Sequence, residues 1–287
     1  IQDTQEAHEW VCKAIDSDYP HVAVDTETTA LYPRNGHILG ISMCCEPDTA
    51  VYIDTDYIDD AVAEKMQELF NKKKIVMHNA KFDLAMLEYH FGFDFPDIED
   101  TMLIHYMLNE IPGNHGLKQL AIKHTKYGDY EKPMYDFIED HCRKNGILRG
   151  DFNFSMIPFD IIQVYAAIDA AVTFLLYDIL IKKLNEDTQI RRVYKQLLIP
   201  GMRFLTDIQE NGVPFDRQRL LLAQEIMSND IEHAMKGLYS YKEVSKFEAF
   251  QDKEFNPNST LQLRKLLFDH IGLKPTGKKT GTGAHST

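Results

Sequence analysis

The sequence predicts an α/β domain over residues 1–186, with a mixed sheet and flanking helices, followed by an α-helical segment over residues 187–287. Short stretches rich in β-branched residues alternate with helical periods before residue 100, which is typical of an α/β domain. From Asp100 onward, almost every segment has the spacing of an amphipathic helix. A change of composition at residues 185–188 places the simplest domain boundary near residue 187.

The expected strands are short, apolar and bounded by Gly, Pro or Asp. They are His21–Val24, Gly36–Met43, Thr49–Ile53 and Lys74–Met77. Apolar residues at helical spacing predict two helices among them, Asp59–Phe70 and Lys81–Phe91, and Gly92 ends the second. Three strands, a helix, a strand and a helix favour a mixed sheet.

The helical remainder is divided by loops and by one Asn-Gly and Pro break at residues 211–216. The expected helices are Asp100–Leu108, Leu117–His124, Pro133–Lys144, Pro158–Asn185, Arg191–Glu210, Arg217–Tyr239 and Thr260–His270. Residues 146–155 are expected to form a loop, and Lys242–Pro257 is polar and expected to be irregular. The last segment, 276–287, is basic and rich in glycine.

The composition is that of a globular protein, with 44% hydrophobic and 26% charged residues. No apolar run reaches the ~20 residues of a membrane span, so no membrane partner is expected. Four cysteines show neither zinc-ligand spacing nor a disulfide framework, which indicates free thiols in a reducing compartment. The net charge of −13 argues against a protein that binds nucleic acid only by neutralising phosphates, but not against a metallonuclease.

Asp25 and Glu27 follow the first expected strand at spacing i, i+2, so their side chains share one face of it. Two carboxylates on one face could jointly bind a hard divalent cation. The D-x-E pattern alone is weak, because it also begins at Asp97, Asp129, Asp230 and Asp252, where the simpler interpretation is a solvated acidic surface.

Asn79 and Asp83 stand at spacing i, i+4 directly after the strand Lys74–Met77, which places them on one face of a helix start. The simpler interpretation is that Asn79 caps the helix and Asp83 favours its dipole. Tyr165 and Asp169 have the same spacing in an Ala- and Leu-rich helix. Burying a carboxylate in such an apolar helix is unfavourable unless it is paired or binds a metal. The alternative is that Asp169 lies on a solvent-exposed stripe of the helix.

Taken in order, DTET at 25–28, HNAKFD at 78–83 and YAAID at 165–169 resemble the motifs of the DEDD exonuclease superfamily. Tyr165 stands where another branch carries His, so the chain resembles the DEDDy branch. The resemblance implies a ribonuclease H-like fold and a two-metal 3′→5′ exonuclease.

By this resemblance, Asp25, Glu27, Asp83 and Asp169 hold two divalent cations, Mg²⁺ or Mn²⁺, on either side of the scissile phosphate. The Tyr165 hydroxyl would orient the attacking water, because its ordinary pKa near ~10 suits positioning better than proton abstraction. The family positions that meet the terminal nucleotide correspond to Thr28, Leu31, Asn79 and Phe82.

Residues 197–221 and 255–287 resemble the opening thumb segments of family A, polymerase I-like DNA polymerases, including the K-K-T-x-T-G-x-x-S-T loop. The basic, Gly-rich loop suits phosphate contact along a primer-template duplex. Such polymerases continue into a palm and fingers that this sequence does not contain, so it cannot extend a primer by itself. A fragment, a split-gene product and the ordered part of a longer protein remain open explanations.

The expected function is therefore proofreading of single-stranded or frayed DNA 3′ ends for a phage-type polymerase. The expected location is the cytoplasm of a bacterial or infected cell, and a replisome or processivity partner is left open. The phage assignment follows from the lack of a 5′-nuclease domain before the exonuclease motifs. Two alternatives stay open. One is a catalytically silent exonuclease fold that acts as a binding module, and the other is a stand-alone RNA exonuclease of the ribonuclease D type.

Overall fold

The computed structural model describes residues 1–275 and 277, and the chain forms two compact units. The first is Ile1–Gly212, and the second begins at Val213. The spatial division therefore falls after Gly212, whereas the composition of the sequence placed the boundary near residue 187.

The first unit is built on a mixed five-stranded sheet with strand order β3-β2-β1-β4-β5 among the described residues. The strands are β1 (His21–Thr28), β2 (Ile38–Cys44), β3 (Val51–Asp54), β4 (Lys74–Met77) and β5 (Ile98–Asp100). β1 and β2, and β2 and β3, are antiparallel, whereas β1, β4 and β5 run parallel. The mixed sheet is confirmed, and β1 extends beyond the expected Val24 to include both acidic residues of DTET.

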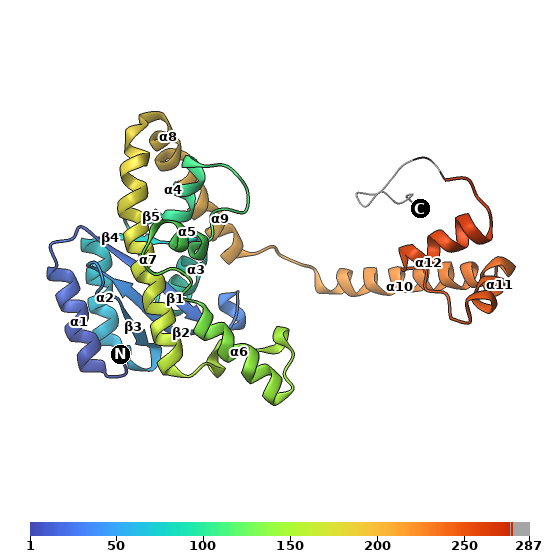
Figure 1. Ribbon diagram of the computed structural model, residues 1–287, viewed down its shortest axis with the longest axis horizontal. Coiled ribbons are helices and arrows are strands. Elements are labelled where there is room, and N and C mark those ends of the chain that lie inside the picture. The colour runs from blue at the N-terminus through green and yellow to red at the C-terminus, as the bar shows by residue number, and fades with distance from the viewer. Residues whose placement is uncertain (276, 278–287) are drawn as a thin grey trace. The chain divides into compact units, whose positions relative to one another are not determined.

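Helices cover both faces of this sheet (Figure 1). The helix α7 crosses one face, and α1 and α2 lie over the other. The helices of the first unit are α1 (Thr4–Asp16), α2 (Asp60–Lys72), α3 (Ala80–Phe91), α4 (Thr101–Leu108), α5 (Leu117–His124), α6 (Lys132–Asn145), α7 (Phe159–Glu186), α8 (Thr188–Val193) and α9 (Ile199–Asn211). The expected loop at 146–155 contains one short 3₁₀ turn, Arg149–Asp151, and the start of a second, Phe154–Met156.

Alternation along β1 divides its side chains between the two faces. Val22 and Val24 are buried in the core formed with α1, α2 and α3. Ala23 is buried on the opposite face, against Ala170 and Phe174 of α7. Continuing the same alternation, the odd-numbered residues after Ala23 face α7, so the sheet points the two acidic side chains of β1 toward that helix.

The helix α7 is the central helix of the first unit. Among the described residues it is the one helix long and apolar enough to cross a membrane, with a mean hydropathy of 1.8, although the sequence was expected to contain no such run. Its most apolar window is 56% buried, and it packs on β1, β2 and β3. The apolar composition is therefore explained by packing on the sheet inside the fold.

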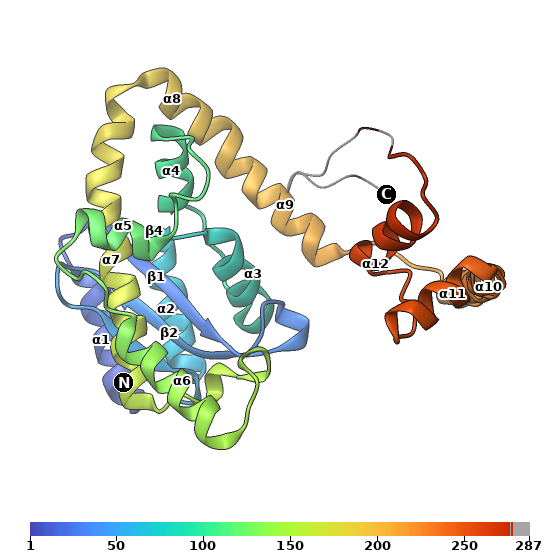
Figure 2. The same cartoon turned by 45° about the vertical axis from the view of Figure 1, so that its right-hand side comes forward.

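The segment after α7 belongs to the first unit because it packs back onto it, past α4 and toward α3 (Figure 2). Tyr194 is fully buried, and its hydroxyl donates to Glu99 Oε2 at 2.8 Å while the amide of Asp100 donates to it at 2.9 Å. A single helix over Arg191–Glu210 was expected, but a π-helical turn at Tyr194–Leu198 separates α8 from α9. Pro200 explains the widened turn, because it has no N–H to donate to the carbonyl four residues earlier.

The second unit contains α10 (Arg217–Tyr239), α11 (Lys242–Gln251), α12 (Thr260–Arg264) and a π-helical turn at Lys265–His270. The expectation of an irregular Lys242–Pro257 was wrong over α11, where Val244 and Phe247 are buried with Phe255 and Leu266. Two apolar residues one turn apart suffice for this helix because their partners come from other elements, both earlier and later in the chain. Of the basic, Gly-rich segment 276–287, all but Gly277 lies outside the described residues.

Candidate active site

Three of the predicted acidic residues converge between β1 and α7. Asp25 and Glu27 project from one face of β1, and Asp169 lies on the facing side of α7. One carboxylate oxygen from each lies within 4.8 Å of the others. Asp169 is 5% exposed, so the alternative of a surface stripe on the helix is wrong.

Asp83, the fourth predicted acidic residue, lies in the first turn of α3 and is tied to the middle of the D-x-E pair. Its Oδ1 accepts hydrogen bonds from the Thr26 amide at 3.0 Å and from the Thr26 hydroxyl at 2.7 Å. Thr26 alternates with Asp25 and Glu27 along β1, so its side chain lies toward α3 rather than α7. The strand therefore positions acidic groups on both of its sides.

The start of α3 is fixed by the Asp100 carboxylate and not by a hydrogen bond to the Asn79 side chain, which was the simpler interpretation of Asn79. Asn79 has a left-handed backbone with φ of 67°, and its side chain forms no cap hydrogen bond. The carboxylate of Asp100, at the end of β5, accepts hydrogen bonds from the amides of Asn79 and Ala80 at 3.2 and 2.9 Å, and it also caps α4. Asp100 thus sets the direction in which α3 leaves the sheet and presents Asp83.

Two tyrosines and a lysine surround Asp169. Lys118 of α5 and the Tyr130 hydroxyl both donate to Asp169 Oδ1. The Tyr165 ring lies one turn before Asp169, and its centroid is 6.2 Å from that of Tyr130. Tyr165 thus lies beside Asp169, and Lys118 and Tyr130 are contacts of Asp169 that the sequence did not predict.

The acidic residues line a cavity of about 380 Å³. Three of the predicted nucleotide contacts, Thr28, Leu31 and Phe82, also line it, and Asn79 is not among the lining residues. Leu31 is 75% exposed, so its side chain is available to a ligand. Two aromatic residues of the expected loop, Phe152 and Phe154, also line it, and Asn153 between them donates to the carbonyl of Thr29 at 3.3 Å.

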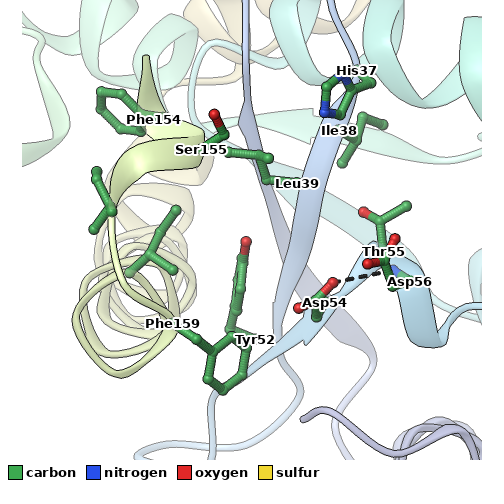
Figure 3. Close-up of a pocket in the computed structure, with 12 residues that line it drawn as sticks. His37, Ile38, Leu39, Tyr52, Asp54, Thr55, Asp56, Phe154, Ser155 and Phe159 are labelled. Carbon is green, nitrogen blue, oxygen red and sulfur yellow. Dashed lines mark hydrogen bonds between the residues drawn. The ribbon is translucent and has the colours of Figure 1, made fainter. Parts of the chain in front are cut away.

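A second cavity of about 360 Å³ shares Phe154 with the first (Figure 3). Its carboxylates, Asp54 and Asp56, come from one turn, and the Asp56 amide donates to Asp54 Oδ1 at 3.1 Å. The first cavity instead gathers carboxylates from three elements, which makes it the candidate for chemistry.

Burial and mutual repulsion hold protons on the acidic cluster. Burial raises the pKa of Glu27 to about 8, assisted by the charge of Asp169 and opposed by Lys118. Burial also raises the pKa of Asp83 to about 7, while the hydrogen bonds from Thr26 lower it. The pKa of Asp25 is raised well above its usual range by burial, then by Asp83, Asp169 and Glu27. Such a cluster gains from a bound cation that neutralises it.

The pKa of Tyr165 is raised, first by burial and then by the charge of Asp169, followed by those of Glu27 and Asp25. The ordinary value expected from the sequence is therefore an underestimate. A phenol with a raised pKa keeps its proton and acts as a hydrogen-bond donor or acceptor, not as a base.

The donor set fits a hard divalent cation. All three groups within 4.8 Å of one another are carboxylates, and oxygen-only ligands suit Mg²⁺ or Mn²⁺ rather than zinc or copper. Asp25, Glu27 and Asp169 would hold one ion, and Asp83 lines the same cavity and lies close enough to raise the pKa of Asp25.

Two of the other D-x-E pairs differ in their exposure to solvent. Asp230 and Glu232 are exposed on α10, as a solvated acidic surface requires. Glu99 is instead buried, and Lys195 donates to its Oε1 at 2.5 Å. The solvated interpretation is therefore wrong for Glu99, which holds the segment after α7 onto β5.

Sequence reasoning missed Thr26, Lys118, Tyr130 and Asp100, all of which contact predicted site residues. Thr26 could have been found, because it lies inside the D-x-E motif and its neighbours were already assigned to one face of the strand. Lys118 and Tyr130 lie 51 and 39 residues from Asp169, and no local pattern links them.

The family model of the 3′–5′ exonuclease of A-type DNA polymerases matches residues 1–185. The DNA polymerase of Escherichia phage T5 is 40% identical over 100% of this chain, which covers 34% of that protein. DNA polymerase I of Borreliella burgdorferi is 26% identical over 88% of the chain and 26% of its own length. This chain thus spans about a third of the length of the phage relative and about a quarter of the length of the bacterial one.

Solved structures share the fold at low sequence identity. The polymerase domain of Pol1 from M. smegmatis, in complex with DNA primer-template and dNTP, has a TM-score of 0.66 at 17% identity, covering 100% of this chain and 43% of that one. Escherichia coli RNase D has a TM-score of 0.55 at 14% identity, with 72% and 50% covered. The sheet and these neighbours agree with a ribonuclease H-like fold. With the family match over residues 1–185 and the phage relative aligned along the whole chain, the protein belongs to the family of 3′–5′ exonuclease domains of A-type DNA polymerases.

Proposed function

We propose that this chain hydrolyses the terminal phosphodiester bond at 3′ ends of DNA with the help of two divalent cations, Mg²⁺ or Mn²⁺. The observation that carries the proposal is the convergence of Asp25, Glu27 and Asp169, with carboxylate oxygens within 4.8 Å of one another. Asp83 adds a fourth carboxylate, itself 2% exposed, whose charge raises the pKa of Asp25. Glu27, Asp83 and Asp169 are buried and Asp25 is half-buried, and the cost of bringing these charges together is offset when a cation binds to them.

The catalytic roles follow from the chemistry of each group. When bound, the cations supply activation of the attacking water and neutralisation of charge at the phosphate and the leaving 3′-oxygen. β1 and α7 position the carboxylate oxygens of Asp25, Glu27 and Asp169 that would bind a cation. The two hydrogen bonds from Thr26 fix the orientation of the Asp83 carboxylate. Tyr165, which keeps its proton, orients the attacking water by hydrogen bonding.

The cavity supports a nucleic-acid end as the substrate. Exposed Leu31, together with Phe82, Phe152 and Phe154, offers apolar surfaces against which terminal bases can stack or pack. Thr28 lines the same cavity and can contact the sugar, and Asn79 lies at the start of α3 near it. DNA is proposed as the substrate because the relatives are DNA polymerases.

The whole protein is proposed to be a phage-type polymerase that proofreads in the cytoplasm of a bacterial or infected cell. The second unit would then be the beginning of its thumb, which contacts primer-template duplex, and palm, fingers and any processivity partner would belong to the rest of the protein. The support is the relationship to the phage T5 DNA polymerase over the full chain.

A cleavage assay with a 5′-labelled single-stranded DNA oligonucleotide tests the proposed function. The wild type is expected to produce successively shorter products in Mg²⁺ and none in EDTA. Asp25→Ala/Glu27→Ala should lose nearly all cleavage, whereas Asp230→Ala/Glu232→Ala, the same pattern on an exposed helix, should cleave like the wild type. Equal cleavage by both double variants would refute the proposal.

The ribonuclease D-type alternative is tested by matched RNA in the same assay, because E. coli RNase D shares the fold. Faster cleavage of the RNA strand would favour it over the DNA exonuclease. The binding-module alternative predicts no cleavage of either strand and no binding of Mn²⁺ in calorimetry.

A further inference from the structure

Lys118 lies inside the acidic site, although none of the sequence motifs includes it. It is the second residue of α5, and its Nζ contacts Asp169 Oδ1, donates to the Tyr130 hydroxyl at 3.0 Å and lies 4.0 Å from Glu131 Oε1. Its side chain is 26% exposed, and two of its neighbours, Asp169 and Tyr165, line the cavity of about 380 Å³.

Two aromatic rings hold this ammonium group in place. Nζ lies 4.2 Å from the ring centroid of Tyr165 and 4.5 Å from that of Tyr130. Cation–π attraction and the hydrogen bond to the Tyr130 hydroxyl therefore act together on one flexible side chain. The arrangement positions an ammonium group beside Tyr165, the residue expected to orient the attacking water.

The charge of Lys118 acts on the whole cluster. It lowers the pKa of Asp25, Glu27 and Asp169, against the larger effect of burial on each. An ammonium group offers three donors and no acceptor, so it cannot share a carboxylate oxygen with a divalent cation without strong repulsion. With a cation on Asp169, Lys118 keeps only the more distant Glu131 carboxylate, 4.0 Å away, and the phosphate of a substrate in this cavity would be an additional anion for it.

We propose that Lys118 is a catalytic residue of the exonuclease, with Nζ donating to a non-bridging oxygen of the scissile phosphate. This rests on the proposed function of the site. Water adds to phosphorus as the bond to the 3′-oxygen breaks, and the electron pair of that bond leaves with the 3′-oxygen. The attacking water gives up a proton to solvent and the leaving oxygen takes one up from solvent, so Lys118 takes part in no proton transfer. It stabilises the negative charge that builds up on the phosphate oxygens.

A purely structural role is the competing explanation, in which Lys118 only holds Asp169 and its neighbours in position. The two roles differ in what removal of the charge does to cation binding. A structural lysine keeps the carboxylates arranged, so its loss weakens Mn²⁺ binding together with activity. A phosphate-contacting lysine lowers the rate of cleavage, while Mn²⁺ affinity stays the same or increases because a competing cation is gone.

The test compares Lys118→Met and Lys118→Arg with Lys126→Met, an exposed lysine that pairs with Asp48. Cleavage of the 5′-labelled strand gives kcat and KM, and calorimetry in the absence of DNA gives the Mn²⁺ affinity. Lys118→Met should lower kcat about 10- to 100-fold with KM within threefold, because one transition-state donor is lost. Its Mn²⁺ affinity should equal or exceed that of the wild type, and Lys118→Arg should recover part of kcat.

Three results would overturn the inference. They are a kcat for Lys118→Met within twofold of Lys126→Met, a change confined to KM, and a fall in kcat accompanied by weaker Mn²⁺ binding in both Lys118 variants. Failure of the proposed function itself is separate, because it would appear as equal cleavage by the wild type and Asp25→Ala/Glu27→Ala.

Discussion

Replacing Glu27 by Gln should stabilise the metal-free protein while abolishing its cleavage activity. Glu27 is 7% exposed and lies between other carboxylates, so its charge is unfavourable in the fold unless a cation binds. Glutamine has nearly the same shape and stays neutral, which imitates the protonated acid. The effect should appear in EDTA and should depend on pH.

The size of the effect follows from the pKa of Glu27, which burial raises from 4.5 to about 8. This interval corresponds to about 5 kcal/mol at most, at about 1.4 kcal/mol per pKa unit. Asp169 raises this pKa and Lys118 lowers it, and the neighbouring carboxylates titrate together with Glu27. We therefore expect Glu27→Gln to increase the free energy of unfolding by about 2 kcal/mol at pH 8. That corresponds to a rise in Tm of about 5 °C for a domain of this size.

The direction with pH is fixed by linkage. The folded protein binds the Glu27 proton more tightly than the unfolded chain does, so this contribution is fully present below about pH 4.5 and is lost as pH rises toward 8. Wild-type stability in EDTA should therefore fall over that interval. The Tm difference between Glu27→Gln and the wild type should be near zero at pH 5 and largest at pH 8.

Thermal unfolding of the wild type, Glu27→Gln and Glu232→Gln in EDTA, from pH 5 to pH 8, measures this difference. Glu232 is exposed on α10 and serves as the matched control, with a Tm expected to follow the wild type. A Tm of Glu27→Gln at pH 8 that is equal to or below that of the wild type would refute the reasoning. So would a difference that does not change with pH.

Three further substitutions test separate parts of the site. Thr26→Val removes the 2.7 Å hydrogen bond to Asp83, and kcat/KM should fall about tenfold because Asp83 loses its alignment. Tyr165→Phe should lower kcat about 10- to 100-fold, with Mn²⁺ affinity within threefold of the wild type, because only water orientation is lost. Tyr194→Phe breaks the hydrogen bonds to Glu99 and Asp100, and urea unfolding should show a loss of about 1–3 kcal/mol.

Each of these has a control or a contradicting result. Thr26→Ser keeps the hydroxyl and should retain most of the activity, so equal losses in both Thr26 variants would contradict the role of that hydrogen bond. Weakened Mn²⁺ binding in Tyr165→Phe would indicate a structural role for the hydroxyl. A Tyr194→Phe variant as stable as the wild type would show that the segment after α7 is not held to the first unit through this contact.

Local patterns predicted most elements of the fold. The strand Lys74–Met77 and the helices Leu117–His124 and Arg217–Tyr239 have the bounds expected from the sequence. They were predictable because apolar periodicity and flanking Gly, Pro or Asp residues report local structure directly. The four acidic motif residues were predictable for a different reason, since their order along the chain resembles that of a known superfamily.

The rest depends on contacts between distant parts of the chain. β5 has three residues, and its pairing with β4 rather than its own composition makes it a strand. α11 forms around Val244 and Phe247 because Phe255 and Leu266 fold back onto them. Lys118 likewise reaches Asp169 only when α5 packs against α7, and a lysine early in an amphipathic helix looks like any solvated residue.

The most direct test of the central claim is the number of Mn²⁺ ions bound per chain, measured by titration with electron paramagnetic resonance in the presence of dTMP. The claim is that Asp25, Glu27, Asp83 and Asp169 form one site for two cations next to the 3′-terminal phosphate. It predicts two ions bound per wild-type chain, with the spectrum of a coupled pair, and loss of that pair in Asp25→Ala/Glu27→Ala. Identical Mn²⁺ binding by the wild type and the double variant would contradict it.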